Sequence, residues 1–178
     1  MKSFYNCFLA ITLLDKFRDD FKLLLKQVAD ISPEFEMTDL VPHITIEYFG
    51  DQTEDNLKTV IQKAKANLKL LKGIKLYIGG LGFFNEDDPF VFYLNVKHSP
   101  GLNNFVEVFE RKDDLPFHAH VTVARMNSIE SKKAFKVNIE NLKRLLDRIN
   151  WQFKFDKLDL YIRDDPKGEF MIFEEILI

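Results

Sequence analysis

The spacing of apolar residues changes several times along this chain, and each change marks the boundary of a predicted element. Between Asp15 and Ala29 the apolar residues recur every three or four positions, which is the spacing of an amphipathic helix. Thr53 and Ser99 each precede another such segment, and a hydroxyl group there can cap the first turn of a helix. The predicted helices span residues 15–29, 53–71, 99–109 and, as one or two helices, 131–149.

Runs of β-branched and aromatic residues, bounded by Gly, Pro, Asn and Asp, predict the strands. The first run resembles the apolar part of a signal peptide, but Asn6 interrupts it and Asp15 follows closely, so we expect a strand. Loops are predicted at residues 82–89 and 113–116. The predicted strands span residues 5–13, 43–49, 73–80, 90–96 and 117–126, followed by a closing hairpin of residues 153–162 and 170–178.

The predicted elements repeat weakly in two halves of the chain. In each half a strand and a helix lead to a strand that begins with His-x-Thr-x, at His43 and at His120, which are 120 − 43 = 77 residues apart. No linker or low-complexity tract separates the halves, so we expect residues 1–178 to form a single domain made of two lobes. Mixed strands and helices without regular βαβ alternation favour an α+β fold with antiparallel sheets.

The two His-x-Thr-x motifs carry the chemistry that this sequence predicts. Residues i and i+2 of a strand share a face, so His43 lies beside Thr45 and His120 beside Thr122. Histidine titrates near neutrality, so one imidazole can act as general base while its partner, protonated, acts as general acid on opposite sides of one phosphorus. The threonine hydroxyls can donate hydrogen bonds to the non-bridging phosphate oxygens. The intervening β-branched residues are expected in the core.

A metal site is the main chemical alternative for these histidines. Two imidazoles are too few for the usual catalytic zinc site, which has three protein ligands. His118 lies two residues before His120 and is the candidate third ligand, although we expect it to contact the substrate at the rim of the site. The sequence therefore predicts a site without a metal. Cys7 is the single cysteine, which excludes an internal disulfide, and we expect it to be buried.

The net charge and the aromatic content of the chain limit the kinds of ligand that we expect it to bind. The formal net charge of −3 argues against a protein that grips duplex DNA, which needs a basic face, but it permits an RNA end or a small nucleotide. No apolar run is long enough to cross a membrane, and we expect a cytoplasmic monomer. Aromatic residues make up 13% of the chain, and Tyr48, Phe84 and Tyr93 are candidates for stacking on a base, with core packing as the alternative role.

The two motifs resemble those of the 2H phosphoesterase superfamily, and within it the 2′-5′ RNA ligase-like, RNA 2′,3′-cyclic phosphodiesterase branch. Residues 42–50 are similar to its His-x-Thr-Leu-x-Phe-Leu-Gly motif, and residues 117–125 to its Pro-His-x-Thr-Leu-Ala-Arg motif. Ala119 replaces the proline usual before the second histidine. The resemblance implies a bilobal, pseudo-symmetric α+β fold in which two antiparallel sheets face a central cleft with helices outside, and it implies no cofactor.

The resemblance also implies a reaction: opening of a 2′,3′-cyclic phosphate to a 2′-phosphate, on an RNA end or a small nucleotide, with 2′-5′ RNA ligase activity in some members. We expect His120 to activate water and His43 to protonate the leaving oxygen, although the two roles are interchangeable. Arg125 matches the motif arginine, but in a regular strand its odd offset from Thr122 points it away from the cleft. The alternatives are a phosphodiesterase of 2′-5′ oligoadenylates or cyclic oligonucleotides, and a nucleotide- or RNA-binding module without turnover.

Overall fold

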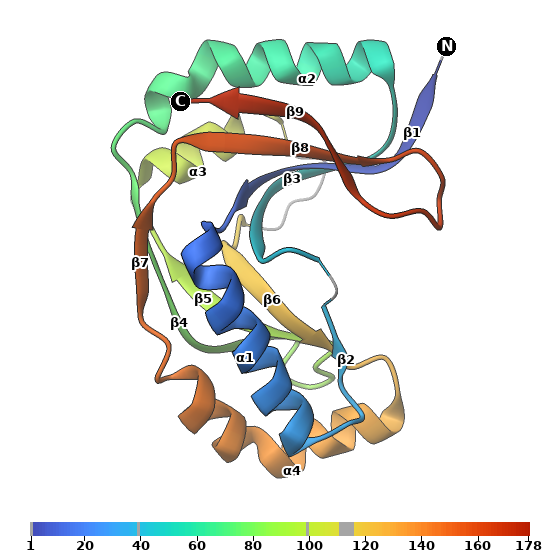
Figure 1. Ribbon diagram of the computed structural model, residues 1–178, viewed down its shortest axis with the longest axis vertical. Helices are drawn as coiled ribbons and strands as arrows, with labels where there is room; N and C mark the ends of the chain where they lie inside the picture. Colours follow the sequence, from blue (N-terminus) through green and yellow to red (C-terminus); the bar gives the residue numbers. More distant parts are fainter. Residues whose placement is uncertain (1, 39, 99, 111–115) are drawn as a thin grey trace.

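The computed structural model describes residues 2–38, 40–98, 100–110 and 116–178, and two antiparallel sheets dominate this part of the chain (Figure 1). The first sheet has the strand order β3 (His43–Thr53), β1 (Ser3–Thr12), β8 (Lys157–Arg163) and β9 (Met171–Leu177). The second sheet has the order β2 (Glu36–Met37), β6 (His120–Arg125), β5 (Val91–Lys97), β4 (Lys75–Phe84) and β7 (Trp151–Lys154).

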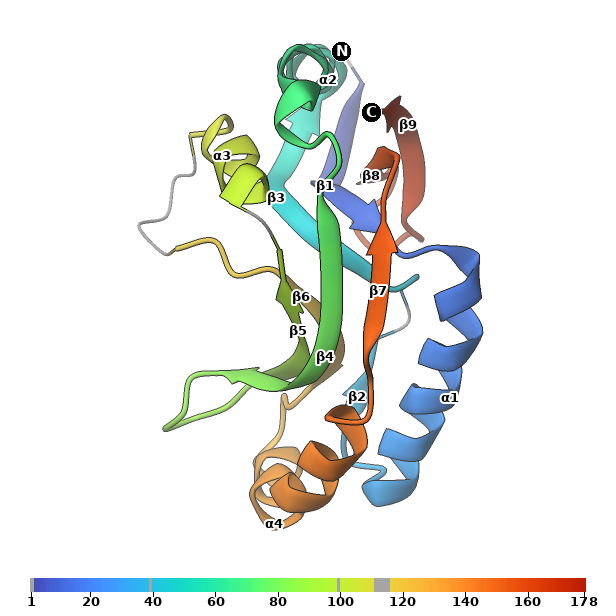
Figure 2. The same ribbon diagram turned by 90° about the vertical axis from the view of Figure 1, so that its left-hand side faces the viewer.

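Helices cover the outer faces of both sheets. The helices are α1 (Asp15–Ile31), α2 (Glu54–Asn67) with a 3₁₀ turn at Leu68–Leu70, α3 (Pro100–Glu107) and α4 (Ile129–Leu146). Helix α2 packs on β3 and β9, and α4 packs on β4 and on α1. Figure 2 shows α1 on one side of the second sheet, where Phe17 contacts Trp151 and Phe153. No helix in the described ranges is both long and apolar enough to span a membrane.

The two sheets repeat one arrangement, as the weak repeat of the sequence predicted. Each motif strand pairs with the first strand of its own half, β3 with β1 and β6 with β5. Each sheet is then extended by a strand from the other half, because β4 pairs with β5 and β8 pairs with β1. This exchange of strands ties the halves together, and one cluster of buried side chains includes residues from both sheets. The predicted α+β fold with two antiparallel sheets is confirmed.

The residues between the motif positions are buried, as expected for strands with one face in a core. Ile44, Ile46, Val121 and Val123 have exposed fractions of 1% or less. Burial of side chains this large contributes about 1.5–3 kcal/mol each to stability. Each histidine motif is therefore anchored by the opposite face of its own strand, which leaves the imidazole and hydroxyl groups on the open face. Cys7 is buried in β1, also as predicted.

Several predicted boundaries were wrong. The loop predicted at residues 82–89 begins later, because β4 continues through Phe84, which pairs with Val91 across a short hairpin. The strand predicted at 153–162 is two strands in different sheets, β7 and β8, separated at Phe155 and Asp156. The segment predicted as one or two helices at 131–149 is the single helix α4, which begins two residues earlier, at Ile129, and ends at Leu146. Strand β3 runs on to Thr53. The predicted cap Ser99 and most of the loop at 113–116 lie outside the described residues.

Local sequence explains where the long helices begin. Thr53 caps α2 as predicted, because its hydroxyl accepts a hydrogen bond from the backbone N–H of Asn56. Helix α4 begins after Ser128, whose hydroxyl accepts from the N–H of Ser131 while the Ser131 hydroxyl accepts from the N–H of Ser128. Such reciprocal capping satisfies two backbone donors at the helix start. These caps fix the ends of helices that cover the sheets.

Candidate active site

The two motif strands lie against each other across the boundary between the sheets. Strand β3 is an edge strand of the first sheet, and it contacts β6 of the second sheet directly. His43 and His120 stand at the first position of these strands, and His43 is close enough to lower the pKa of His120 electrostatically. The structure therefore brings together two histidines that the sequence separates by 77 residues.

The two imidazoles are held by equivalent hydrogen bonds, each to the carbonyl oxygen two residues before the histidine. The distance from His43 Nδ1 to the carbonyl oxygen of Val41 is 2.8 Å, and that from His120 Nδ1 to the carbonyl oxygen of His118 is also 2.8 Å. A carbonyl oxygen only accepts, so Nδ1 carries the proton in both rings. Nε2 is then the nitrogen of each ring that can take up or release a proton.

Burial makes both histidines easier to keep neutral. Desolvation lowers the pKa of His43, partly offset by its hydrogen bond to Val41. Desolvation also lowers the pKa of His120, partly offset by the hydrogen bond to the carbonyl oxygen of His118, and the charges of His118, His43 and Arg125 lower it further. A bound phosphate would act in the opposite direction, because an anion favours the imidazolium form. In the unliganded site the lowered pKa values therefore favour the neutral imidazole at both positions.

A β-bulge follows each motif at the same place, and it changes which side chains face the cleft. Ile46 has no cross-strand partner in the pairing of β3 with β1, and Val123 has none in the pairing of β6 with β5. One extra residue reverses the alternation of the strand beyond it. Tyr48 and Arg125, each five residues after its histidine, are thereby turned to the cleft face. The expectation that Arg125 points away from the cleft was therefore wrong, because it assumed a regular strand.

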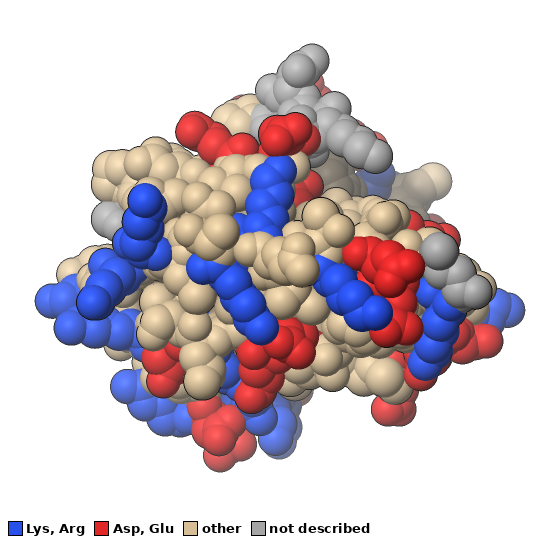
Figure 3. Space-filling model, turned by 90° about the horizontal axis from the view of Figure 1, so that it is seen from above, with Lys and Arg blue, Asp and Glu red and all other residues tan. Residues whose placement is uncertain are grey.

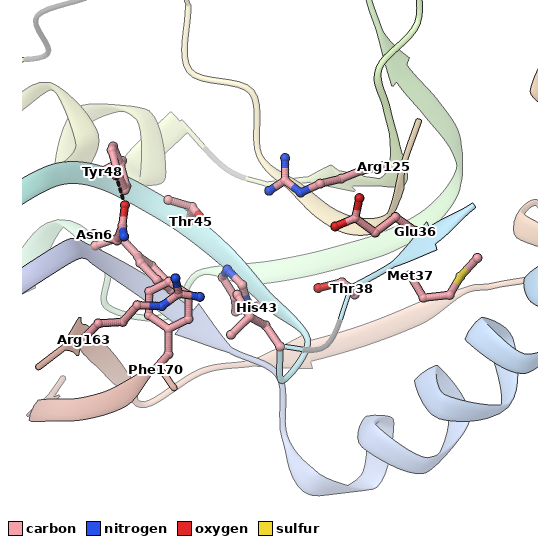
Figure 4. A pocket seen from close by; sticks show the side chains of 12 residues that line it. Asn6, Glu36, Met37, Thr38, His43, Thr45, Tyr48, Arg125, Arg163 and Phe170 are labelled. Atoms are coloured by element: carbon pink, nitrogen blue, oxygen red, sulfur yellow. Dashed lines mark hydrogen bonds between the residues drawn. The ribbon is translucent and has the colours of Figure 1, made fainter. Parts of the chain in front are cut away.

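A cavity of about 540 Å³ adjoins His43 on the first sheet (Figure 4). Tyr48 is 57% exposed there, and its hydroxyl donates a 2.7 Å hydrogen bond to Asn6 Oδ1. Arg125 enters the cavity from β6, opposite the first sheet. His120 and Thr122 do not line this cavity. The lining residues are Asn6, Phe8, Glu36, Met37, Thr38, Leu40, His43, Thr45, Tyr48, Arg125, Arg163 and Phe170.

The far end of the cavity holds a cation that the sequence did not indicate. The guanidinium carbon of Arg163 lies 3.8 Å from the centre of the Phe170 ring, and its Nη1 donates to the carbonyl oxygen of Pro166. The cavity therefore has an arginine at each end, Arg125 and Arg163. No local pattern identifies Arg163, because only the pairing of β8 with β1 brings it to the cleft.

The other aromatic candidates surround His120. The ring centre of Phe84 is 5.0 Å from that of His120, and the centre of Tyr93 is 4.9 Å away. The ring of His118 also contacts those of Phe84 and Tyr93. Tyr93 is only 4% exposed, so its ring packs against the histidines and leaves little surface for a base. Phe84 is partly exposed and keeps part of its ring accessible.

A buried polar network lies beside His43 on the first sheet. Asp159 is fully buried, its carboxylate accepts a hydrogen bond from the Thr12 hydroxyl, and Lys157 lies 3.3 Å away. The Thr12 hydroxyl has one proton and gives it to Asp159, so the Tyr161 hydroxyl, 2.8 Å away, donates to Thr12. Thr12 is the cross-strand partner of His43, so this network supports the strand segment that carries the histidine.

The metal alternative needs a third ligand near the two histidines. No group of three or more His, Cys, Asp or Glu side chains placed to hold a metal ion occurs among the residues that the structure describes. His118 turns its ring to Phe84 and Tyr93 instead of completing such a group. His43 and His120 alone are fewer than the three protein ligands of a usual catalytic zinc site.

Comparison with known proteins gives a family match and many structural matches. The sequence model of the 2′-5′ RNA ligase superfamily matches residues 33–167, which is more than half of the chain. No curated protein sequence matches. The protein TT0787 of Thermus thermophilus is 18% identical, with 97% of each chain covered and a TM-score of 0.70.

Two further structures extend the comparison. E. coli LigT, solved in complex with ATP, is 16% identical, with 99% of this chain and 98% of that chain covered and a TM-score of 0.70. LigT has also been solved with 3′-AMP and with phosphate. Usb1 of Kluyveromyces marxianus is 16% identical, with 99% of this chain and 97% of that chain covered and a TM-score of 0.52. At these identities the likeness shows the fold alone.

Proposed function

We propose a function for this chain from one premise: it belongs to the 2′-5′ RNA ligase superfamily, whose 2H phosphoesterases act on phosphodiester bonds. The proposed reaction is the metal-independent opening of a 2′,3′-cyclic phosphate to a 2′-phosphate, at an RNA end or on a small nucleotide. The observation that carries the proposal is the matched pair of imidazoles, His43 and His120. Each ring is held at Nδ1 by the carbonyl oxygen two residues before it, on neighbouring strands of different sheets.

In the proposed step, His120 is the general base and His43 the general acid. Nε2 of His120 takes a proton from water while the water oxygen forms a bond to phosphorus. The bond from phosphorus to O3′ breaks, and Nε2–H of His43 gives its proton to that oxygen. The products are a 2′-phosphate and a free 3′-hydroxyl, and proton exchange with solvent then restores the starting state. General acid and base catalysis of this kind contributes typically 10²–10⁴-fold to the rate.

The hydroxyl and guanidinium groups of the site have complementary roles. Thr45 and Thr122 follow their histidines by two residues on the same face, so their hydroxyls are proposed to donate to the non-bridging oxygens. Arg125 is proposed to neutralise charge that builds up on the phosphate, since its side chain enters the cavity beside His43. Tyr48 and Phe84 are proposed to contact the base, and His118 and Tyr93 to hold the His120 ring.

The arginine at the far end of the cavity favours a second candidate. With Arg125 and Arg163 at opposite ends, the cavity offers cations for two phosphate groups, as in a 2′-5′-linked oligoadenylate or a cyclic oligonucleotide. The same histidines would then cleave a linkage between two nucleosides. An Arg163→Ala variant that loses turnover of such a substrate, while keeping turnover of a cyclic mononucleotide, would favour this candidate.

Turnover of a 2′,3′-cyclic mononucleotide in excess EDTA tests the proposal directly. We expect a 2′-phosphate product, loss of at least 10²-fold in kcat for His43→Ala and for His120→Ala, and about 10²-fold for Thr45→Val. Thr59→Val on the exposed face of α2 is the matched control and should retain full activity. Activity that disappears with EDTA would refute the metal-free reaction, and an active His43→Ala variant would refute the site. Binding without any product would support the binding-module alternative.

A further inference from the structure

A second hollow lies on the second sheet, away from the cavity beside His43. It has a volume of about 560 Å³ and lies where β4 begins and β5 ends. It is basic and aromatic, and among the residues that the structure describes no Asp or Glu lines it. The lining residues are Gly73, Ile74, Lys75, Tyr77, Lys97 and His98.

The register of the strands places this hollow on the same face of the sheet as His120. Asn95 pairs directly with His120, and Lys97, two residues further along β5, shares the face of Asn95. Lys97 in turn pairs directly with Tyr77 of β4. Two strand spacings and two residues along the strand separate Tyr77 from His120, which is about 12 Å. A single strand of nucleic acid several nucleotides long can therefore reach both places.

The positive charges of Lys75 and Lys97 at this hollow are not neutralised by acidic neighbours in the described part of the chain. Residues 56–85 contain no Asp or Glu, although the whole chain carries a formal net charge of −3. Neither Lys75 nor Lys97 forms an ion pair with any residue in the described part of the chain. The lysines of α2 differ, because Lys65 lies 2.9 Å from Glu174 and Lys58 lies 2.9 Å from Glu54. Figure 3 shows the resulting mixture of positive and negative side chains on the face over α2 and β9.

The aromatic residue completes the pattern. Tyr77 is 43% exposed, although its neighbours along β4, Leu76 and Ile78, are buried. A tyrosine ring on an open sheet face can stack on a nucleobase, and lysines around it can bind phosphates of the backbone. An exposed ring flanked by unpaired lysines suits single-stranded RNA better than an acidic protein, which would not need the ring.

We propose that the surface of Lys75, Tyr77 and Lys97 binds the single-stranded RNA that leads up to the terminal phosphate at His43 and His120. This inference rests on the proposed function for the end of the RNA but concerns a separate surface. It assigns an oligonucleotide rather than a free mononucleotide as the preferred substrate. It also explains how a chain with net negative charge can bind RNA, since Lys75 and Lys97 lie on the face of His120 without ion-pair partners among the described residues.

The test compares two substrates that end in the same 2′,3′-cyclic phosphate, a mononucleotide and a single-stranded RNA decamer. For the variant Lys75→Glu/Lys97→Glu we expect kcat/KM to fall about tenfold or more on the decamer and less than about twofold on the mononucleotide. Loss of two phosphate contacts should also reduce the slope of log K against log salt for decamer binding by about 1.4. Tyr77→Ala should weaken decamer binding about tenfold without changing that slope.

The matched control is Lys26→Glu/Lys136→Glu, which makes the same change of charge on exposed positions of α1 and α4. The proposal is overturned if this control weakens decamer turnover as much, or if Lys75→Glu/Lys97→Glu affects both substrates equally. If the unaltered protein turns over neither substrate, the proposed function fails. Decamer binding, measured by fluorescence anisotropy, then still tests the proposed RNA-binding surface. Equal binding by the unaltered protein and by Lys75→Glu/Lys97→Glu would refute that surface.

Discussion

A methyl group added at Gly82 should disturb His120 indirectly, by displacing the ring of Tyr93. Gly82 lies on β4 directly opposite Tyr93, and the Tyr93 ring covers it. A Cβ atom at Gly82 would lie 2.2 Å from Cε2 of Tyr93 and 2.8 Å from Oδ1 of Asn95. Carbon atoms in contact are about 3.5 Å apart, so the Tyr93 ring would have to move by about 1.3 Å (3.5 − 2.2).

Three other rings lie close to the Tyr93 ring. Its centre is 4.6 Å from that of Phe84, 5.2 Å from that of His118 and 4.9 Å from that of His120, and its own side chain is 4% exposed. A shift therefore displaces His120 or opens the strands. Overpacking of this kind costs about 1–3 kcal/mol of stability, and moving a catalytic group by about 1 Å costs about 10²-fold in rate.

The assay for Gly82→Ala combines kcat on a cyclic mononucleotide with the free energy of unfolding in urea. Gly73→Ala is the control, because its added Cβ meets no described residue within 4 Å. Its φ of +78° makes a similar loss of stability expected through backbone strain. We expect only Gly82→Ala to lose activity. Replacing Tyr93 by Leu in the Gly82→Ala background should restore part of the stability. Full activity in Gly82→Ala, or no energetic coupling between positions 82 and 93, would show that the Tyr93 ring does not transmit the change to His120.

Three further predictions follow from the burial of single groups. Burial lowers the pKa of both His43 and His120, and the proposed reaction needs one of them protonated while the other is neutral. We therefore expect kcat/KM to peak below about pH 6.5, and a maximum above about pH 7.5 would contradict this. Asp159→Ala should cost about 3 kcal/mol in urea denaturation, since Thr12 and Lys157 lose a buried partner, whereas Glu174→Ala in the surface pair with Lys65 should cost under about 1 kcal/mol. Desolvation raises the pKa of Cys7 to about 11, so the native protein should not react with a thiol reagent at pH 8 and the denatured protein should react fully.

Much of the fold followed from local patterns. The helix at α1 and the capped start of α2 were predicted because apolar spacing and capping residues act over a few positions. The same holds for the shared face of each histidine and threonine, since alternation is a property of any strand. The equivalence of the two motif strands also followed from the sequence, because both halves repeat one order of elements.

Other features depended on partners that are distant in the sequence. Phe155 and Asp156 divide one apolar run into strands of two different sheets, and nothing local indicates which sheet takes which strand. Arg163 reaches the cleft only because β8 pairs with β1. The continuation of β4 through Phe84 likewise depends on its pairing with β5, which outweighs the loop-forming glycine before it.

Strand alternation alone was enough to predict that two histidines and two threonines would stand on the open faces of two equivalent strands. Which other side chains join them depends on how the strands pair. A bulge after each motif, at Ile46 and Val123, turns Tyr48 and Arg125 to the cleft, although simple alternation points them away. This could not be predicted locally, because the register of a strand is set by its hydrogen-bonded neighbour, and that neighbour lies tens of residues away along the chain.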